Sequence, residues 1–124
     1  MPEGFAGARI LVVEDEALIS VLIEDALEGL GYDTVGPVPS VPEAMALAET
    51  EALAAAVLDV NVGGEPVYPV ANVLKRRGIP FVFVTGYQRD ELPVAHGDAP
   101  LLEKPFGDTM LAKAIRSLIE VEMC

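Results

Sequence analysis

The fold is decided by the stretch RILVVEDE at residues 9–16, where a run of aliphatic residues stops abruptly at three acidic ones. A short apolar run of this kind predicts a strand buried on both faces, as in a parallel sheet. The next segment, residues 17–30, repeats apolar side chains at helical spacing and ends before Gly31, a residue typical of helix ends. The stretch therefore predicts a strand–helix unit with acidic residues at the carboxyl end of its strand.

The same alternation continues along the chain. Four more short apolar runs have the composition of strands: residues 34–38, 54–58, 81–84 and 101–102. Helical spacing predicts further helices that begin near Ser40, Val70 and Leu111. The first of these has the S-x-x-E spacing of a capping box, formed by Ser40 and Glu43.

Alternating strands and helices predict an α/β fold, because each crossover between parallel strands is right-handed and helices must cover both faces of the sheet. We expect a doubly wound, five-stranded parallel sheet in the flavodoxin-like order 2-1-3-4-5. Pro37 indicates that residues 34–38 form an edge strand, since proline has no N–H to donate to a neighbouring strand on both sides. Residues 60–69 contain two glycines and two prolines and are predicted to form a loop, and any helix within 88–99 should be weak.

Length and composition restrict the class of protein. With 124 residues, 52% of them hydrophobic, the chain can build one core, and we expect a single domain over residues 8–124 preceded by a flexible tail over residues 1–7. We expect no output domain within these 124 residues. The 20 acidic against 8 basic residues give a formal charge of −12, which disfavours nucleic acid and membrane surfaces as partners. Short apolar runs and the lack of a signal peptide predict a cytoplasmic chain, and the single Cys124 excludes disulfide and zinc architectures.

Side chains that could bind or react with a ligand follow four of the predicted strands. Ligands of open parallel sheets bind at the carboxyl ends of the strands, where this chain carries acid, acid, hydroxyl and ammonium groups. The residues are Glu14, Asp15, Asp59, Thr85 and Lys104. In the predicted strand order the three carboxylates share one pocket, and a set of oxygen ligands suits Mg²⁺.

Each of these residues has an ordinary structural interpretation when taken singly. Asp59 could be a helix N-cap, Glu14 and Asp15 could favour a helix dipole, Thr85 could cap a turn, and Lys104 could be a surface cation. The combination at converging strand ends is the specific signal, and it favours a functional site.

Four motifs resemble the receiver domain of two-component response regulators, in that family's order and approximate spacing: VEDE (13–16), VLDVN (57–61), VTG (84–86) and LEKPF (102–106). The resemblance covers essentially the whole chain. It implies that Asp59 accepts a phosphoryl group and that Asp15, Asp59 and the backbone carbonyl of Asn61 ligate Mg²⁺, with Glu14 acting through water. It also implies that Thr85 and Lys104 hold phosphoryl oxygens and that the Lys104–Pro105 peptide bond is cis.

One position departs from the family's pattern. Receivers usually carry an aromatic switch residue on the last strand, where this chain has Leu101. The segment FVTGY (83–87) is similar to the signature of the FAT GUY receivers, which implies that Tyr87 replaces the switch and that partners are histidine kinases of the HWE and related types, or phosphotransfer proteins. The surface expected to change on phosphorylation includes Tyr87, Leu101 and Leu111, on a monomer or weak dimer.

The function implied is a stand-alone receiver that signals through altered protein contacts or acts as a phosphate sink. A second hypothesis is an aspartyl-phosphate phosphohydrolase, but those enzymes resemble a D-x-D pattern, and the Asp59-Val60-Asn61 segment offers an amide that cannot act as the general acid. A third is an adaptor that works without phosphorylation, in which the carboxylates only modulate stability.

Overall fold

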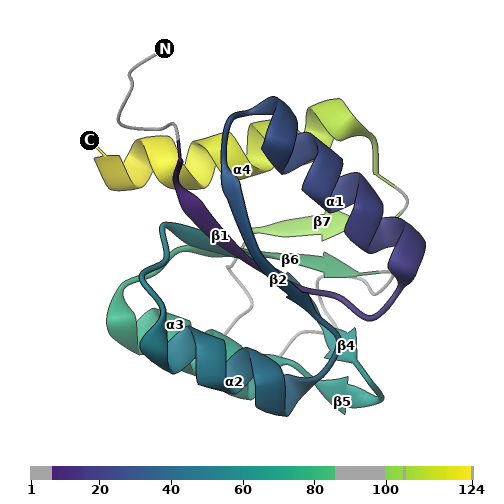
Figure 1. Ribbon diagram of the computed structural model, residues 1–124, viewed down its shortest axis with the longest axis vertical. Coiled ribbons are helices and arrows are strands. Elements are labelled where there is room, and N and C mark those ends of the chain that lie inside the picture. Colours follow the sequence, from purple (N-terminus) through teal and green to yellow (C-terminus); the bar gives the residue numbers. More distant parts are fainter. Residues whose placement is uncertain (1–6, 86–99, 105, 124) are drawn as a thin grey trace.

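A five-stranded parallel sheet forms the centre of the computed structural model, which describes residues 7–85, 100–104 and 106–123 (Figure 1). Its strands are β1 (Arg9–Val13), β2 (Asp33–Val38), β3 (Ala55–Asp59), β6 (Phe81–Thr85) and β7 (Leu101–Glu103). They lie in the order β2-β1-β3-β6-β7, and all neighbouring strands are parallel. Counting only the strands of this sheet, the order is 2-1-3-4-5, so the predicted fold is confirmed. No helix among these residues has the length and apolar character needed to cross a membrane.

Helices cover both faces of the sheet. They are α1 (Ala17–Gly29), α2 (Val41–Thr50), α3 (Tyr68–Arg77) and α4 (Asp108–Met123). Figure 1 shows α1 and α4 on one side of the sheet and α2 and α3 on the other. Alternate residues of β1 point to the two sides, so that Ile10 and Val12 join the core under α1 and α4, while Leu11 and Val13 join the core under α2 and α3.

The helix ends follow the chemistry predicted from the sequence. Ser40 Oγ accepts a hydrogen bond from the Glu43 N–H at 3.5 Å and donates to the Glu43 carboxylate at 3.0 Å, which starts α2. Gly78, with φ of +73°, ends α3 in the left-handed conformation directly after the basic last turn. These local signals therefore set where the elements begin and end.

Two predictions about local structure are wrong. Residues 60–69 are not simply a loop, because β4 (Asn61–Val62) and β5 (Glu65–Pro66) pair as an antiparallel hairpin and α3 already begins at Tyr68. Leu111 cannot belong to a changing surface, because its side chain is fully buried in the core under α1 and α4.

Some expectations concern residues that the structure does not describe. These are the tail at residues 1–6, the segment 86–99 and the peptide bond to residue 105. Gly7, the last residue of the expected tail, donates its N–H to the Gly31 carbonyl at 2.7 Å.

Candidate functional site

Four of the five residues predicted at the strand ends line one cleft of about 510 Å³ at the carboxyl edge of the sheet, and the fifth, Glu14, is buried against Lys104. The cleft is lined by acidic, amide, hydroxyl and ammonium side chains together with one glycine. They are Asp15, Glu16, Asp59, Asn61, Gly64, Thr85 and Lys104. Parallel pairing of β1, β3, β6 and β7 brings these residues together from segments far apart in the sequence.

Asp59 is the last residue of β3 and is only 5% exposed. The strand pairing fixes its backbone, because Asp59 is in register with Val84 of β6 and the next residue, Val60, donates its N–H to the Val84 carbonyl at 3.2 Å. Its Oδ1 atom accepts the N–H of Asn61 at 3.3 Å, and its Oδ2 atom lies 3.3 Å from the Lys104 ammonium. The carboxylate is thus held in place by backbone pairing, an amide hydrogen bond and a cation.

Lys104 is the cation of the site and contacts three carboxylates. Its backbone N–H donates to the Thr85 carbonyl at 2.9 Å, which ties the residue to the end of β6. Its Nζ atom lies 2.6 Å from Glu16 Oε1 and 3.3 Å from both Glu14 Oε1 and Asp59 Oδ2. Burial lowers the pKa of Lys104, but the hydrogen bond to Glu16 and the charges of Asp59 and Glu14 outweigh it, so the pKa lies above its usual value. The ammonium is therefore charged at neutral pH.

Glu14 is almost completely buried directly after β1. Its Oε2 atom accepts the Glu16 N–H at 3.1 Å, whereas Oε1, although 3.3 Å from the Lys104 ammonium, receives no hydrogen bond from any described residue. Burial raises the pKa of Glu14 to about 7, and the neighbouring Asp59 adds to the rise. A buried carboxylate oxygen without a donor indicates that a further positive or donating group belongs in this cleft.

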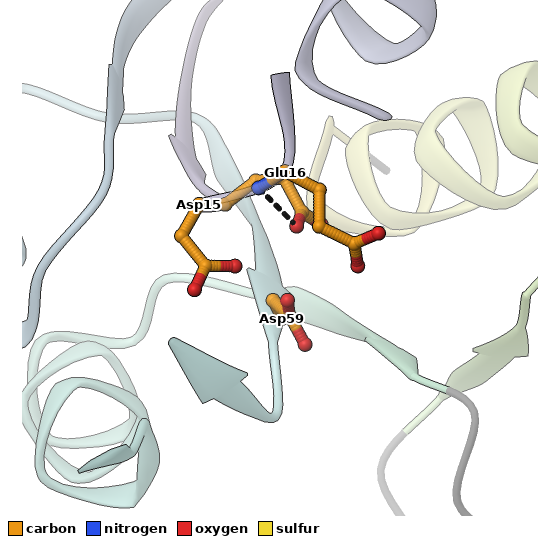
Figure 2. Close-up of side chains that lie close together, drawn as sticks. Asp15, Glu16 and Asp59 are labelled. Carbon is orange, nitrogen blue, oxygen red and sulfur yellow. Dashed lines mark hydrogen bonds between the residues drawn. The ribbon is translucent and has the colours of Figure 1, made fainter. Parts of the chain in front are cut away.

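The carboxylates have the arrangement of a site for a divalent cation. Ligand oxygens of Glu14, Asp15, Glu16 and Asp59 lie within 4.8 Å of one another. Figure 2 shows the Asp15 and Glu16 side chains directed toward the side on which Asp59 lies. Even with Glu14 partly protonated, the other three carboxylates outnumber the single ammonium, and hard oxygen ligands are the ones Mg²⁺ prefers. The residues present therefore fit this ion.

The predicted site residues do not all have the same place in the structure. Asn61 and Thr85 line the cleft with Asp59. Leu101 is partly buried on β7, where it pairs with Phe83 and packs against the core under α2 and α3, away from the carboxylates. Tyr87 lies outside the described residues.

Glu16 was missed by the sequence analysis. As a third acidic residue before α1, it has no distinguishing spacing, and only the folded chain shows it as the closest partner of Lys104. The other missed feature is the Gly63-Gly64 pair at the tip of the β4–β5 hairpin, although two glycines between short extended segments are a known hairpin signal.

Comparison with curated proteins finds regulatory proteins, while no protein-family model matches. The phyllosphere-induced regulator PhyR of Methylorubrum extorquens is 32% identical over 105 residues, covering 79% of this chain and 38% of PhyR. The transcriptional regulatory protein PdtaR of Mycobacterium tuberculosis is 31% identical over 111 residues, covering 86% of this chain and 54% of PdtaR. The chain thus spans about half or less of the length of these relatives.

Solved structures match over nearly the whole chain. SdrG from Sphingomonas melonis is 46% identical, with a TM-score of 0.80 and coverage of 91% of this chain and 97% of SdrG. A response regulator receiver protein from Sinorhizobium medicae is 26% identical, with a TM-score of 0.79 and coverage of 92% and 95%. The receiver domain of a sensor histidine kinase from Pseudomonas aeruginosa, which has a magnesium ion in its active-site cleft, is 25% identical, with a TM-score of 0.80 and coverage of 93% and 99%. With this fold, this acidic cleft and these relatives, the chain belongs to the response regulator receiver domains of two-component signalling.

Proposed function

We propose that Asp59 accepts a phosphoryl group from the phosphohistidine of a histidine kinase or phosphotransfer protein, in a reaction that depends on Mg²⁺. The observation that carries this proposal is the environment of Asp59. It is a buried carboxylate at the carboxyl edge of the sheet, 3.3 Å from a charged ammonium and grouped with three further carboxylates.

The chemistry needs positioning and charge neutralisation more than proton transfer, because phosphoryl transfer passes through a loose transition state. An oxygen of ionised Asp59 attacks phosphorus, the bond from phosphorus to the donor imidazole breaks, and the leaving nitrogen keeps the bond's electrons and takes up a proton. The Lys104 ammonium and the Thr85 hydroxyl hold phosphoryl oxygens. Asp15, Asp59 and the Asn61 carbonyl would hold Mg²⁺, with Glu14 acting through water, and the ion would neutralise charge on the phosphoryl oxygens.

The output is a change in protein contacts, or removal of phosphoryl groups from another branch of a pathway with the chain as a sink. As a domain of this family it catalyses its own phosphorylation and dephosphorylation only. The FVTGY segment supports placement among the FAT GUY receivers, with Tyr87 and Leu101 at the switch and HWE-type kinases as donors. Phosphotransfer from a purified HWE kinase, and none from a kinase of another type, would support that assignment.

Phosphorylation by a small acyl phosphate tests the central proposal. Wild-type protein incubated with acetyl phosphate and Mg²⁺ should gain one phosphoryl group in its intact mass, and Asp59→Asn should gain none. Asp33→Asn is the matched control, because Asp33 is an exposed aspartate at the opposite, amino end of β2. Full labelling of Asp59→Asn would overturn the assignment, and steady turnover of a phosphate ester would favour the phosphohydrolase hypothesis instead.

A further inference from the structure

The β4–β5 hairpin touches the site through its tip. Its two turn residues, Gly63 and Gly64, have φ of +60° and +79°, as the central positions of a two-residue hairpin require. The hairpin follows Asp59 directly, so its position is fixed by the same strand that carries the acceptor aspartate.

The Gly63 N–H donates a hydrogen bond to Asp15 Oδ2 at 2.9 Å. This bond joins two residues that lie 48 positions apart in the chain. Asp15 itself is exposed and follows the end of β1, so the strand does not fix its side chain. The hairpin tip thus holds one oxygen of Asp15, while the carboxylate still faces the cleft that it shares with Asp59 (Figure 2).

Gly63 is also in close contact with a second loop. A Cβ atom added at this residue would lie 3.2 Å from the Pro39 carbonyl oxygen and 4.0 Å from the Ser40 Cα atom. The exposed tip therefore lies close to both the segment after β1 and the segment after β2. Gly78, which ends α3 and does not line the cleft, differs: its φ is +73°, but a Cβ atom there would have nothing within 4 Å.

We infer that Gly63 is a positioning residue for the metal site, which uses its backbone N–H to hold Asp15 in the orientation that binds Mg²⁺. This inference rests on the proposed function, in which Asp15 is a metal ligand. Groups that hold a ligand carboxylate by hydrogen bonding reduce the freedom it loses on binding, and their loss typically weakens metal affinity by 10–100-fold. A side chain at Gly63 would press against the Pro39 carbonyl oxygen and displace the tip, which would disturb the geometry of its hydrogen bond to Asp15.

The test compares Gly63→Ala with Gly78→Ala, using the full chain and Mg²⁺ alone. Both variants place a side chain at positive φ, so both should lose thermal stability without metal. Isothermal titration should show a dissociation constant for Mg²⁺ raised by about 10-fold in Gly63→Ala, and one close to wild type in Gly78→Ala. Wild-type affinity in Gly63→Ala, or equal losses in the two variants, would overturn the inference.

A second measurement does not depend on the folding of either variant. Hydrogen exchange of the Gly63 amide, followed by NMR without metal, should be faster in Asp15→Ala than in wild type, while the Gly64 amide serves as internal reference. An unchanged rate at Gly63 would contradict the inference. A wild-type protein that binds no Mg²⁺ would instead show that the proposed function has failed, so the two failures are distinguishable.

Discussion

Among single residues, Glu14 has the most unusual environment, because a carboxylate is buried beside a second one. Its pKa rises from 4.5 to about 7, chiefly through burial and further through Asp59. A raised pKa means that the folded state keeps a proton that the unfolded chain releases. The stabilisation from this proton is therefore complete below pH 4.5 and is lost as pH rises to about 7.

We expect the free energy of unfolding, measured by urea in the absence of Mg²⁺, to fall by about 3 kcal/mol across this pH interval. Glu14→Gln should remove most of the fall, because an amide of similar shape does not titrate there. Glu28→Gln is the control, since Glu28 is exposed on α1. Equal pH dependence in the two variants would show that Glu14 is not the titrating group.

The sequence predicts which residues form the site, but not which of them contact one another. Glu14, Asp15, Asp59 and Lys104 each follow an apolar run, and the parallel sheet places the ends of such runs together. Which carboxylate would contact Lys104 most closely depends on side-chain conformation, and spacing along the chain does not encode it. The 2.6 Å contact of Lys104 with Glu16 therefore appears only in the folded structure.

Among the secondary-structure elements, one glycine in β2 and one in α1 differ in backbone φ and in the space around them, and substituting each by alanine tests the effect on stability. Gly36 in β2 has φ of +97°, and a Cβ atom there would lie 2.9 Å from the Val38 nitrogen and 3.0 Å from the Val12 carbonyl oxygen. Gly29, at the end of α1, has open space around it.

Gly36→Ala should lower the free energy of unfolding by about 2 kcal/mol, because the new methyl group meets backbone atoms at a strained φ. Gly29→Ala should raise it by about 0.5–1 kcal/mol, because alanine restricts the unfolded chain at no steric cost. Thermal and urea unfolding of the two variants would check both signs. Loss of stability in both would mean that the environment of Gly29 is also constrained.

The helices and the strands of the main sheet were predicted from their apolar patterns, whereas the two-residue strands β4 and β5 were not. Helical spacing over residues 17–30 and the β-branched run of β1 repeat the same signal several times, so sequence alone identifies them. The hairpin of β4 and β5 consists of two residue pairs, too few for any periodicity. Its signal was the Gly63-Gly64 pair, interpreted as part of a loop because Pro66 and Pro69 follow it closely.

For the whole molecule, charge is the dominant property. A formal charge of −12 on 124 residues repels itself in the folded state, and the acidic cleft concentrates part of that repulsion at one edge of the sheet. Any salt should screen the repulsion between charges across the whole surface. Only a bound divalent cation should also relieve the repulsion between the carboxylates of the cleft.

Magnesium chloride should therefore raise the thermal unfolding midpoint more than sodium chloride at matched ionic strength. A ligand that binds only the folded state at about 100 times its dissociation constant contributes about 2.7 kcal/mol. Asp15→Asn should lose most of this excess, because it removes one carboxylate from the cleft. Asp33→Asn removes one negative charge at the far end of the sheet and should keep the excess. If the two salts stabilise the wild type equally, screening alone explains the effect and the cleft does not bind the ion. If Asp15→Asn keeps the full excess, the ion binds through other residues.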